Sequence, residues 1–279
     1  MQTSRLFDAL PDAFHGDPHT GDPVDPRWHD IAEHVSGFTS PNELAVLNLA
    51  AAVLPADEAY LEVGTFKGRS LVAAVQDNAD KTFYAMENFV EFGMAGQEAH
   101  AELKDNLKRF AGETDVHLLE GDAFTLMAKP GLIDRPVGVY FYDGEHTLLS
   151  HYLALAVVEP LLADEALVLV DDATWPVVQR AHRLFLKRHP GWRIEATWDA
   201  ERADDPRWAN GLHALVFRRV PGRRRGMSRT DEALRGYQTT VQDRVNKVAW
   251  AAAHRFPGPV KKAASVLLSR SRAIGGDDH

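Results

Sequence analysis

Seven short apolar segments alternate with helical ones between residues 59 and 218, and this alternation restricts the chain to few folds. Strands that alternate with helices form a parallel sheet with helices on both faces. We therefore predict an α/β, doubly wound architecture. The predicted strands are 59–63, 82–87, 115–119, 137–143, 166–171, 192–198 and 212–218, and the predicted helices between them are 68–77, 97–110, 147–162 and 174–188.

The last two predicted strands are an exception to the alternation. The segment between them, DAERADDPRWAN at residues 199–210, contains no convincing helix. Strands without a helical crossover pair in antiparallel fashion. We expect 192–198 and 212–218 to form an antiparallel pair at one edge of the sheet.

Residues 1–39 are predicted to be an N-terminal arm, because residues 11–26 are rich in Pro, Gly and Asp and favour irregular structure. A helix is expected to follow directly. Ser40 can cap it, Pro41 suits its first position, and Glu43 completes a capping box. The central domain is predicted to span residues 40–219.

The C-terminal part differs from the rest in charge. Residues 218–279 contain 14 of the 31 Lys and Arg residues but 5 of the 40 Asp and Glu residues. We predict a basic helical extension over 220–279. It is expected to dock on the acidic body of its own chain or of a neighbouring subunit in a homo-oligomer, with peripheral contact to an anionic surface as the second choice. Nucleic acid is not expected as a partner, because the acidic body repels phosphate.

Composition excludes several classes of site. The chain contains no cysteine, which rules out disulfides, thiolate metal sites and cysteine nucleophiles. A metal would need oxygen or imidazole ligands. No apolar stretch approaches the roughly 20 residues that cross a bilayer, and the N-terminus lacks the pattern of a signal peptide. We expect a cytoplasmic protein without an integral membrane segment.

Ligands of open α/β sheets bind at the carboxyl ends of the strands, so the loops there are the first place to look. The first loop is LEVGTFKGRSL. Gly64 permits a sharp turn, Gly68 permits close packing of the following helix, and Ser70 lies in the first helical turn, where free amides face a ligand. Glu62 and Thr65 flank the turn.

The next two loops add the features of a nucleoside site. Glu87 ends the second strand, 19 residues after Gly68, where an acid can accept hydrogen bonds from both ribose hydroxyls. Asp122 and Ala123 follow the third strand, where an adenine ring would lie. The chain lacks G-x-G-x-x-G and G-K-[ST], which argues against a dinucleotide and against a P-loop.

The segments EVGTFKGRS, MEN, GDA, YDGEH and LVDDA, in this order, resemble the class I S-adenosylmethionine-dependent methyltransferases. They are most similar to the Mg²⁺-dependent small-molecule O-methyltransferases related to the macrocin and cephalosporin-pathway enzymes. The resemblance covers residues 40–218. It implies a Rossmann-like, mostly parallel sheet of strand order 3-2-1-4-5-7-6. It also implies that S-adenosylmethionine is bound by Glu62, Gly64, Thr65, Gly68, Ser70, Glu87, Asn88, Asp122, Ala123 and Asp143.

A metal site is predicted beside this cofactor. Asp143 ends the fourth strand, and Asp171 and Asp172 end the fifth, which is its neighbour in the implied order. Three clustered carboxylates repel each other unless a cation neutralises them, and oxygen ligands suit Mg²⁺, with Mn²⁺ as an alternative. In the other interpretation, Asp171 caps a helix, Asp172 is exposed, and Asp143 stabilises a turn.

His146 is the candidate general base. It follows Asp143 by three residues, so the two catalytic candidates should share one rim of the cleft. A hydroxyl bound to Mg²⁺ is more acidic, and an imidazole can remove its proton during methyl transfer. Catechol-type relatives have a lysine at this offset. The alternatives are that His146 caps the helix or binds the metal.

These inferences predict an O-methyltransferase acting on a carbohydrate hydroxyl, of an oligosaccharide or a glycosylated metabolite. The resemblance points to the carbohydrate. A catechol-type small-molecule acceptor is the runner-up, and an NAD-dependent oxidoreductase or a noncatalytic scaffold is less favoured. The N-terminal arm, as a lid, and Trp175, after the acid pair, are candidates to line the acceptor pocket.

Overall fold

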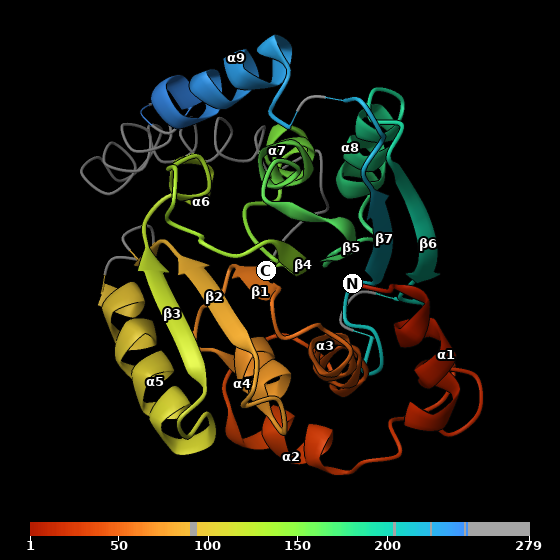
Figure 1. Ribbon diagram of the computed structural model, residues 1–279. Coiled ribbons are helices and arrows are strands. Elements are labelled where there is room, and N and C mark those ends of the chain that lie inside the picture. The colour runs from red at the N-terminus through yellow and green to blue at the C-terminus, as the bar shows by residue number, and fades with distance from the viewer. Residues whose placement is uncertain (90–93, 203–204, 224, 243, 245–279) are drawn as a thin grey trace, which may run out of the picture.

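The computed structural model describes residues 1–89, 94–202, 205–223, 225–242 and 244. A seven-stranded sheet lies at its centre, with helices on both faces (Figure 1). The strand order is β3-β2-β1-β4-β5-β7-β6, as predicted. The strands are β1 (Ala59–Val63), β2 (Thr82–Glu87), β3 (Asp115–Glu120), β4 (Val137–Tyr142), β5 (Leu162–Val170), β6 (Trp192–Trp198) and β7 (Leu212–Arg218).

The pairing of the strands brings several loops to one edge of the sheet. Strands β1 to β5 pair in parallel, and β7 runs antiparallel to both β5 and β6, as expected for the last pair. In register, Val63 of β1 lies opposite Tyr142 of β4, which lies opposite Val170 of β5. Because these three strands end at the same level, the loops that follow them meet.

Two hydrophobic clusters fill the space between the sheet and its helical layers. Successive strand residues point to opposite faces, so Tyr60 belongs to one cluster and Leu61 to the other. Helices on the first face are α1 (Ser4–Ala13), α2 (Arg27–His34), α3 (Pro41–Ala52), α4 (Arg69–Val75) and α5 (Met94–Phe110). Those on the second are α6 (Ala123–Leu126), α7 (Leu148–Val158), α8 (Pro176–Leu186) and α9 (Arg229–Tyr237) (Figure 1).

Helix α3 begins as its sequence predicts. The Ser40 backbone N–H donates to Glu43 Oε2 at 2.7 Å, and the Glu43 N–H donates to Ser40 Oγ at 3.4 Å, which closes the capping box. Pro41 occupies the first helical position. The helix is buried on nearly all sides, so this cap also fixes Glu43 inside the protein.

The N-terminal arm contains more helix than its composition suggests. Helix α1 continues through Pro11 to Ala13, within the segment expected to be irregular, and α2 begins at Arg27. Leu6 and Leu10, four residues apart, lie on one face of α1 and are buried. They belong to the same hydrophobic cluster as α3. A lid role for this arm stays a prediction.

The described part of the predicted extension is irregular up to Ser228 and helical from Arg229 onward. Helix α9 is followed by a π-helical turn, η2 (Gln238–Gln242). Residues 245–279, which hold the rest of the predicted basic extension, lie outside the described residues. No helix in the described ranges has both the length and the apolar character needed to cross a membrane.

Candidate functional site

The loop after β1 passes very close to the end of β4. Gly64 has φ of +91°, and a Cβ there would lie 1.8 Å from the carbonyl oxygen of Asp143. Any side chain would therefore push the two loops apart. Gly68 caps α4 with φ of +89°, and its Cβ would lie 2.5 Å from Leu103 Cδ1. Both predicted roles of these glycines agree with the geometry.

Glu62 is buried beneath this loop. Its carboxylate accepts hydrogen bonds from Tyr60 Oη at 3.1 Å and from Ser70 Oγ at 3.0 Å. Burial raises the pKa of Glu62 to about 7. Thr65 is also buried in this turn. The structure thus brings together the residues that the first loop was predicted to contribute.

Glu87 joins the first loop to the second. Its two carboxylate oxygens accept the backbone N–H groups of Phe66 and Asn88, each at 2.7 Å. Burial raises the pKa of Glu87. The third loop is close by, since the Gly121 N–H donates to the Glu87 carbonyl at 2.9 Å. There Asp122 caps α6, of which Ala123 is the first residue, by accepting the Thr125 N–H at 2.7 Å.

Asp143, His146 and Asp172 form the metal-ligand candidate among the described residues. Potential ligand atoms of all three lie within 4.8 Å of one another. His146 Nδ1 is 3.1 Å from Asp172 Oδ2, an electrostatic contact without hydrogen-bond alignment. Asn210 Nδ2 donates to Asp172 Oδ1 at 2.9 Å. The ends of β4 and β5 therefore converge as predicted, and His146 is at the same rim.

Asp171 lies beside this group but is not one of the three. Its Oδ1 accepts the backbone N–H of Asp172 at 2.7 Å. Burial, followed by the charges of Glu43 and Asp143, raises the pKa of Asp171 well above its ordinary value. A metal-ligating role for Asp171 stays a prediction.

Glu43 is a member of this acidic group that the sequence reasoning treated only as a capping residue. Burial raises its pKa to about 7, the charge of Asp172 adds to the effect, and a hydrogen bond with Asp171 opposes it. Two buried carboxyl groups in contact favour sharing one proton. A glutamate in the first turn of a helix rich in apolar residues was the available signal.

Aromatic rings surround His146. The Trp175 ring lies edge-on to it, with 5.2 Å between ring centroids, and the His151 ring stacks at 5.8 Å. His151 is buried, and its burial lowers its pKa well below the ordinary value. Trp175, predicted to be near the acceptor, is thus in contact with the candidate base.

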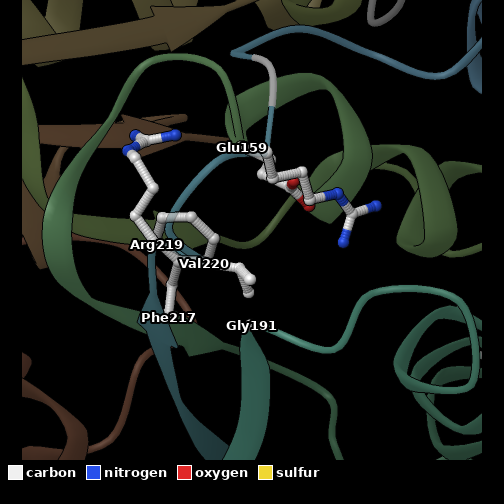
Figure 2. Close-up of a pocket in the computed structure, with 6 residues that line it drawn as sticks. Glu159, Gly191, Phe217, Arg219 and Val220 are labelled. Carbon is white, nitrogen blue, oxygen red and sulfur yellow. The ribbon is translucent and has the colours of Figure 1, made fainter.

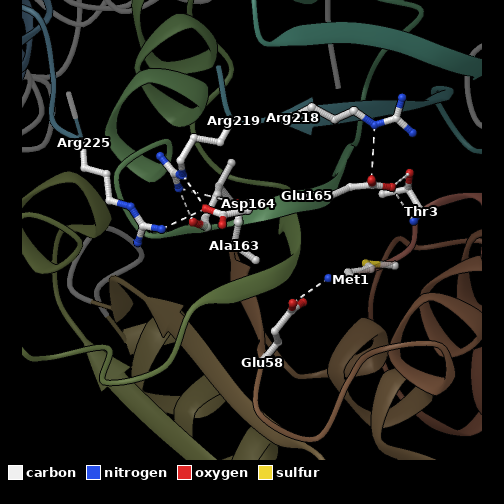
Figure 3. A network of polar contacts seen from close by, with 10 residues as sticks. Met1, Thr3, Glu58, Ala163, Asp164, Glu165, Arg218, Arg219 and Arg225 are labelled. Carbon is white, nitrogen blue, oxygen red and sulfur yellow. Dashed lines mark hydrogen bonds and ion pairs between the residues drawn. The ribbon is translucent and has the colours of Figure 1, made fainter. Parts of the chain in front are cut away.

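Two pockets lie away from these residues, where the parallel strands begin. The first, of about 10 Å³, has room for no more than a water molecule (Figure 2). The second, of about 510 Å³, is lined by charges that pair with one another, such as Met1 N with Glu58 and Arg218 Nε with Glu165 (Figure 3). Neither contains a predicted site residue.

Comparison with known proteins shows which kind of domain the central part of the chain contains. Residues 61–173 match the family model described as a methyltransferase domain, a span that starts in β1 and ends just after Asp172. This match identifies a methyltransferase domain in this part of the chain. The methyltransferase domain thus includes every predicted site residue, from Glu62 to Asp172. This match argues against the alternative prediction of an NAD-dependent oxidoreductase.

Solved structures share the fold of this methyltransferase domain at low sequence identity. An O-methyltransferase from Bacillus cereus in complex with SAH is 14% identical, with a TM-score of 0.51 over 70% of this chain and 92% of that one. The O-methyltransferase TomG from Streptomyces achromogenes, in complex with SAM, is 13% identical, with a TM-score of 0.50 over 78% and 96%.

SAH-bound PaMTH1, a methyltransferase from Podospora anserina, is 14% identical, with a TM-score of 0.50 over 78% and 95%. No curated protein matches the chain.

Proposed function

We propose that this protein is an S-adenosylmethionine-dependent, divalent-metal-dependent O-methyltransferase that acts on a hydroxyl of a carbohydrate. The observation that carries the proposal is the convergence of Asp143, His146 and Asp172 at the edge of the domain where the first loop also lies. Similar folds that hold SAH or SAM in O-methyltransferases support the choice of donor.

The methyl donor fits the loops after β1, β2 and β3. Each oxygen of the Glu87 carboxylate accepts one backbone N–H and keeps a further lone-pair direction for a ribose hydroxyl. Gly64 lets the first loop pass directly against the end of β4, which brings the proposed donor loops next to Asp143. Asp122 and Ala123 start α6 beside Glu87, which suits the adenine end.

The acidic residues fit a divalent cation. The Asp143 and Asp172 carboxylates lie close together, and nearby Asp172 and Glu43 add to the effect of burial in raising the pKa of Asp143 well above its ordinary value. A cation among these oxygens would relieve the repulsion. We propose Asp143 and Asp172 as ligands, with Asp171 next to them. Bound Mg²⁺ would fix the acceptor hydroxyl and make it more acidic.

His146 is proposed to take the proton of the acceptor. Its Nδ1 faces the Asp172 carboxylate, and this leaves Nε2 to accept the proton. S-adenosylmethionine would supply the methyl group to the acceptor oxygen and leave as S-adenosylhomocysteine, while His146 would hold the proton of the acceptor. No covalent enzyme intermediate is required.

The acceptor class is proposed on three grounds. Adjacent hydroxyls of a sugar can chelate a metal, and the macrocin-like resemblance favours a carbohydrate over a catechol. Trp175, in contact with His146, presents an aromatic ring on which a sugar face can stack. A catechol-type acceptor remains the second candidate, since its two oxygens chelate equally well.

A methyl-transfer screen tests the proposal. Full-length protein is supplied with radiolabelled S-adenosylmethionine and a panel of oligosaccharides, glycosylated metabolites and catechols, with Mg²⁺ or with EDTA. We expect transfer to carbohydrates only when the metal is present. Glu113→Gln, at an exposed site far from the loops, is the control variant.

Each part of the proposal can fail separately. Transfer that survives EDTA would contradict the metal, and preferential transfer to catechols would contradict the acceptor. Calorimetry with S-adenosylhomocysteine and with NAD tests the donor, since binding of NAD alone would contradict S-adenosylmethionine.

A further inference from the structure

The described part of the C-terminal extension touches the loop that carries the candidate catalytic residues. This catalytic loop, residues 143–147, runs from the end of β4 to the cap of α7. Glu145 lies between Asp143 and His146 in the loop. Gln238 Nε2 donates a hydrogen bond to Glu145 Oε2 at 2.7 Å, across 93 positions of sequence.

We propose that Gln238, near the start of the C-terminal extension, is a positioning residue that fixes the catalytic loop through Glu145. This inference rests on the function proposed above. It assigns to the start of the extension a role beyond docking on the acidic body.

Helix α9 is anchored firmly enough to transmit such a restraint. Ser228 caps it by accepting the Asp231 N–H at 3.1 Å. The buried Asp231 carboxylate accepts a hydrogen bond from Tyr152 Oη of α7 at 2.9 Å. Leu234 packs against the hydrophobic cluster on this face of the sheet. Helix α7 begins at the end of the catalytic loop, so both the loop and α9 are attached to this helix (Figure 1).

Gln238 differs from an ordinary surface side chain. It is 6% exposed, although it belongs to the periphery of the fold. It caps the end of α9 and is the first residue of the π-helical turn. Such turns change the direction of the side chains that follow, and they are frequent at functional sites. The buried NH2 group of this amide needs an acceptor, and Glu145 supplies it.

The catalytic loop is held from two sides. On the inner side, the Glu145 carbonyl accepts hydrogen bonds from Tyr142 Oη, at 3.1 Å, and from Ser150 Oγ. On the outer side, the Glu145 side chain meets Gln238. Without the hydrogen bond between Gln238 and Glu145, the loop would still be held by the hydrogen bonds to the Glu145 carbonyl but would be less restrained on its outer side. His146 would then shift relative to Asp172, which lies 3.1 Å away.

A charge exchange between the two positions tests the contact in the full-length protein. Gln238→Glu places two carboxylates opposite each other and should release the loop. Combining Gln238→Glu with Glu145→Gln restores an amide-to-carboxylate hydrogen bond with donor and acceptor exchanged. Glu232→Gln, an exposed position on the same helix, is the matched control.

Two measurements are independent of methyl transfer. We expect Gln238→Glu to accelerate hydrogen–deuterium exchange over residues 143–150 by about 2- to 10-fold. This factor corresponds to the net free energy that one partly exposed hydrogen bond contributes. Mn²⁺ affinity should fall by a similar factor, because the proposed ligand Asp143 lies in the loop. The affinity for S-adenosylhomocysteine should stay unchanged. The double variant should recover both lost properties, and kcat or the acceptor KM should follow the same pattern.

Three results would overturn the inference: unchanged exchange in Gln238→Glu, no recovery in the double variant, or altered exchange without any change in Mn²⁺ affinity or turnover. If the wild-type protein binds no Mn²⁺ and methylates no acceptor, the proposed function fails. The exchange data would still decide whether Gln238 fixes the loop.

Discussion

Replacement of Glu43 by Gln should change how stability depends on pH. The pKa of this carboxyl is raised from 4.5 to about 7, first by burial and then by the charge of Asp172. A folded-state pKa above the unfolded value means that the folded protein binds the proton more tightly. The contribution of Glu43 to stability is therefore present at low pH and is lost as pH rises from about 4.5 to about 7.

The magnitude follows from the size of this shift. Each pKa unit corresponds to about 1.4 kcal/mol, so wild-type protein should lose about 2 to 3 kcal/mol between pH 5 and pH 8 through this group. A glutamine at position 43 cannot ionise but keeps an oxygen to accept the Ser40 N–H of the capping box. The variant should therefore gain that amount at pH 8 relative to pH 5.

Urea unfolding at pH 5, 6, 7 and 8, with EDTA to remove divalent metal, measures this difference. Comparison with wild type at each pH cancels the titration of groups that do not interact with Glu43, such as the buried His182, whose pKa is lowered to about 3 by burial. Glu113→Gln, an exposed substitution of the same kind, should give a curve parallel to wild type. Parallel curves for Glu43→Gln would refute the reasoning.

Three further outcomes are expected. Asp143→Asn and Asp172→Asn should each lower Mg²⁺ or Mn²⁺ affinity at least about tenfold in calorimetry, and unchanged affinity would remove the proposed metal site. His146→Asn should lower kcat by about 10²- to 10⁴-fold with metal affinity nearly unchanged, whereas a loss of metal affinity would identify His146 as a ligand. Gly64→Ala should destabilise the fold by more than about 2 kcal/mol in urea unfolding, because a methyl group there meets the Asp143 carbonyl; near wild-type stability would contradict this contact.

Much of the fold was predictable because its signals are local and repeated. The strands β1, β2, β6 and β7 begin and end where the sequence places them, since each apolar run is bounded by a turn. β5 starts four residues earlier than expected, at Leu162, because Asp164 and Glu165 interrupt its apolar pattern. Helix α1 was hidden by Pro11, a residue that usually ends helices.

Within the candidate site, the sequence predicted the positions of residues that follow directly after strands, because the strand order brings those ends together. The approach of Asp143 to Asp172 follows from the strand order, which the resemblance implied. The proximity of Glu43 to Asp171 and the contact of Gln238 with Glu145 depend on how helices outside the sheet pack, and no short motif encodes that. The roles of the predicted donor-binding residues and the cytoplasmic location stay predictions.

The backbone at position 172 limits how this site can vary. Asp172 has φ of +54°, a left-handed conformation that strains most residues and that Asp, Asn and Gly accept most readily. Related sequences could thus replace the negative charge at this position with a neutral amide, or lose the side chain altogether, at little cost in folding. A longer acid such as glutamate would strain the backbone, so the charge offered to the proposed metal can vary at this position more easily than the length of the side chain.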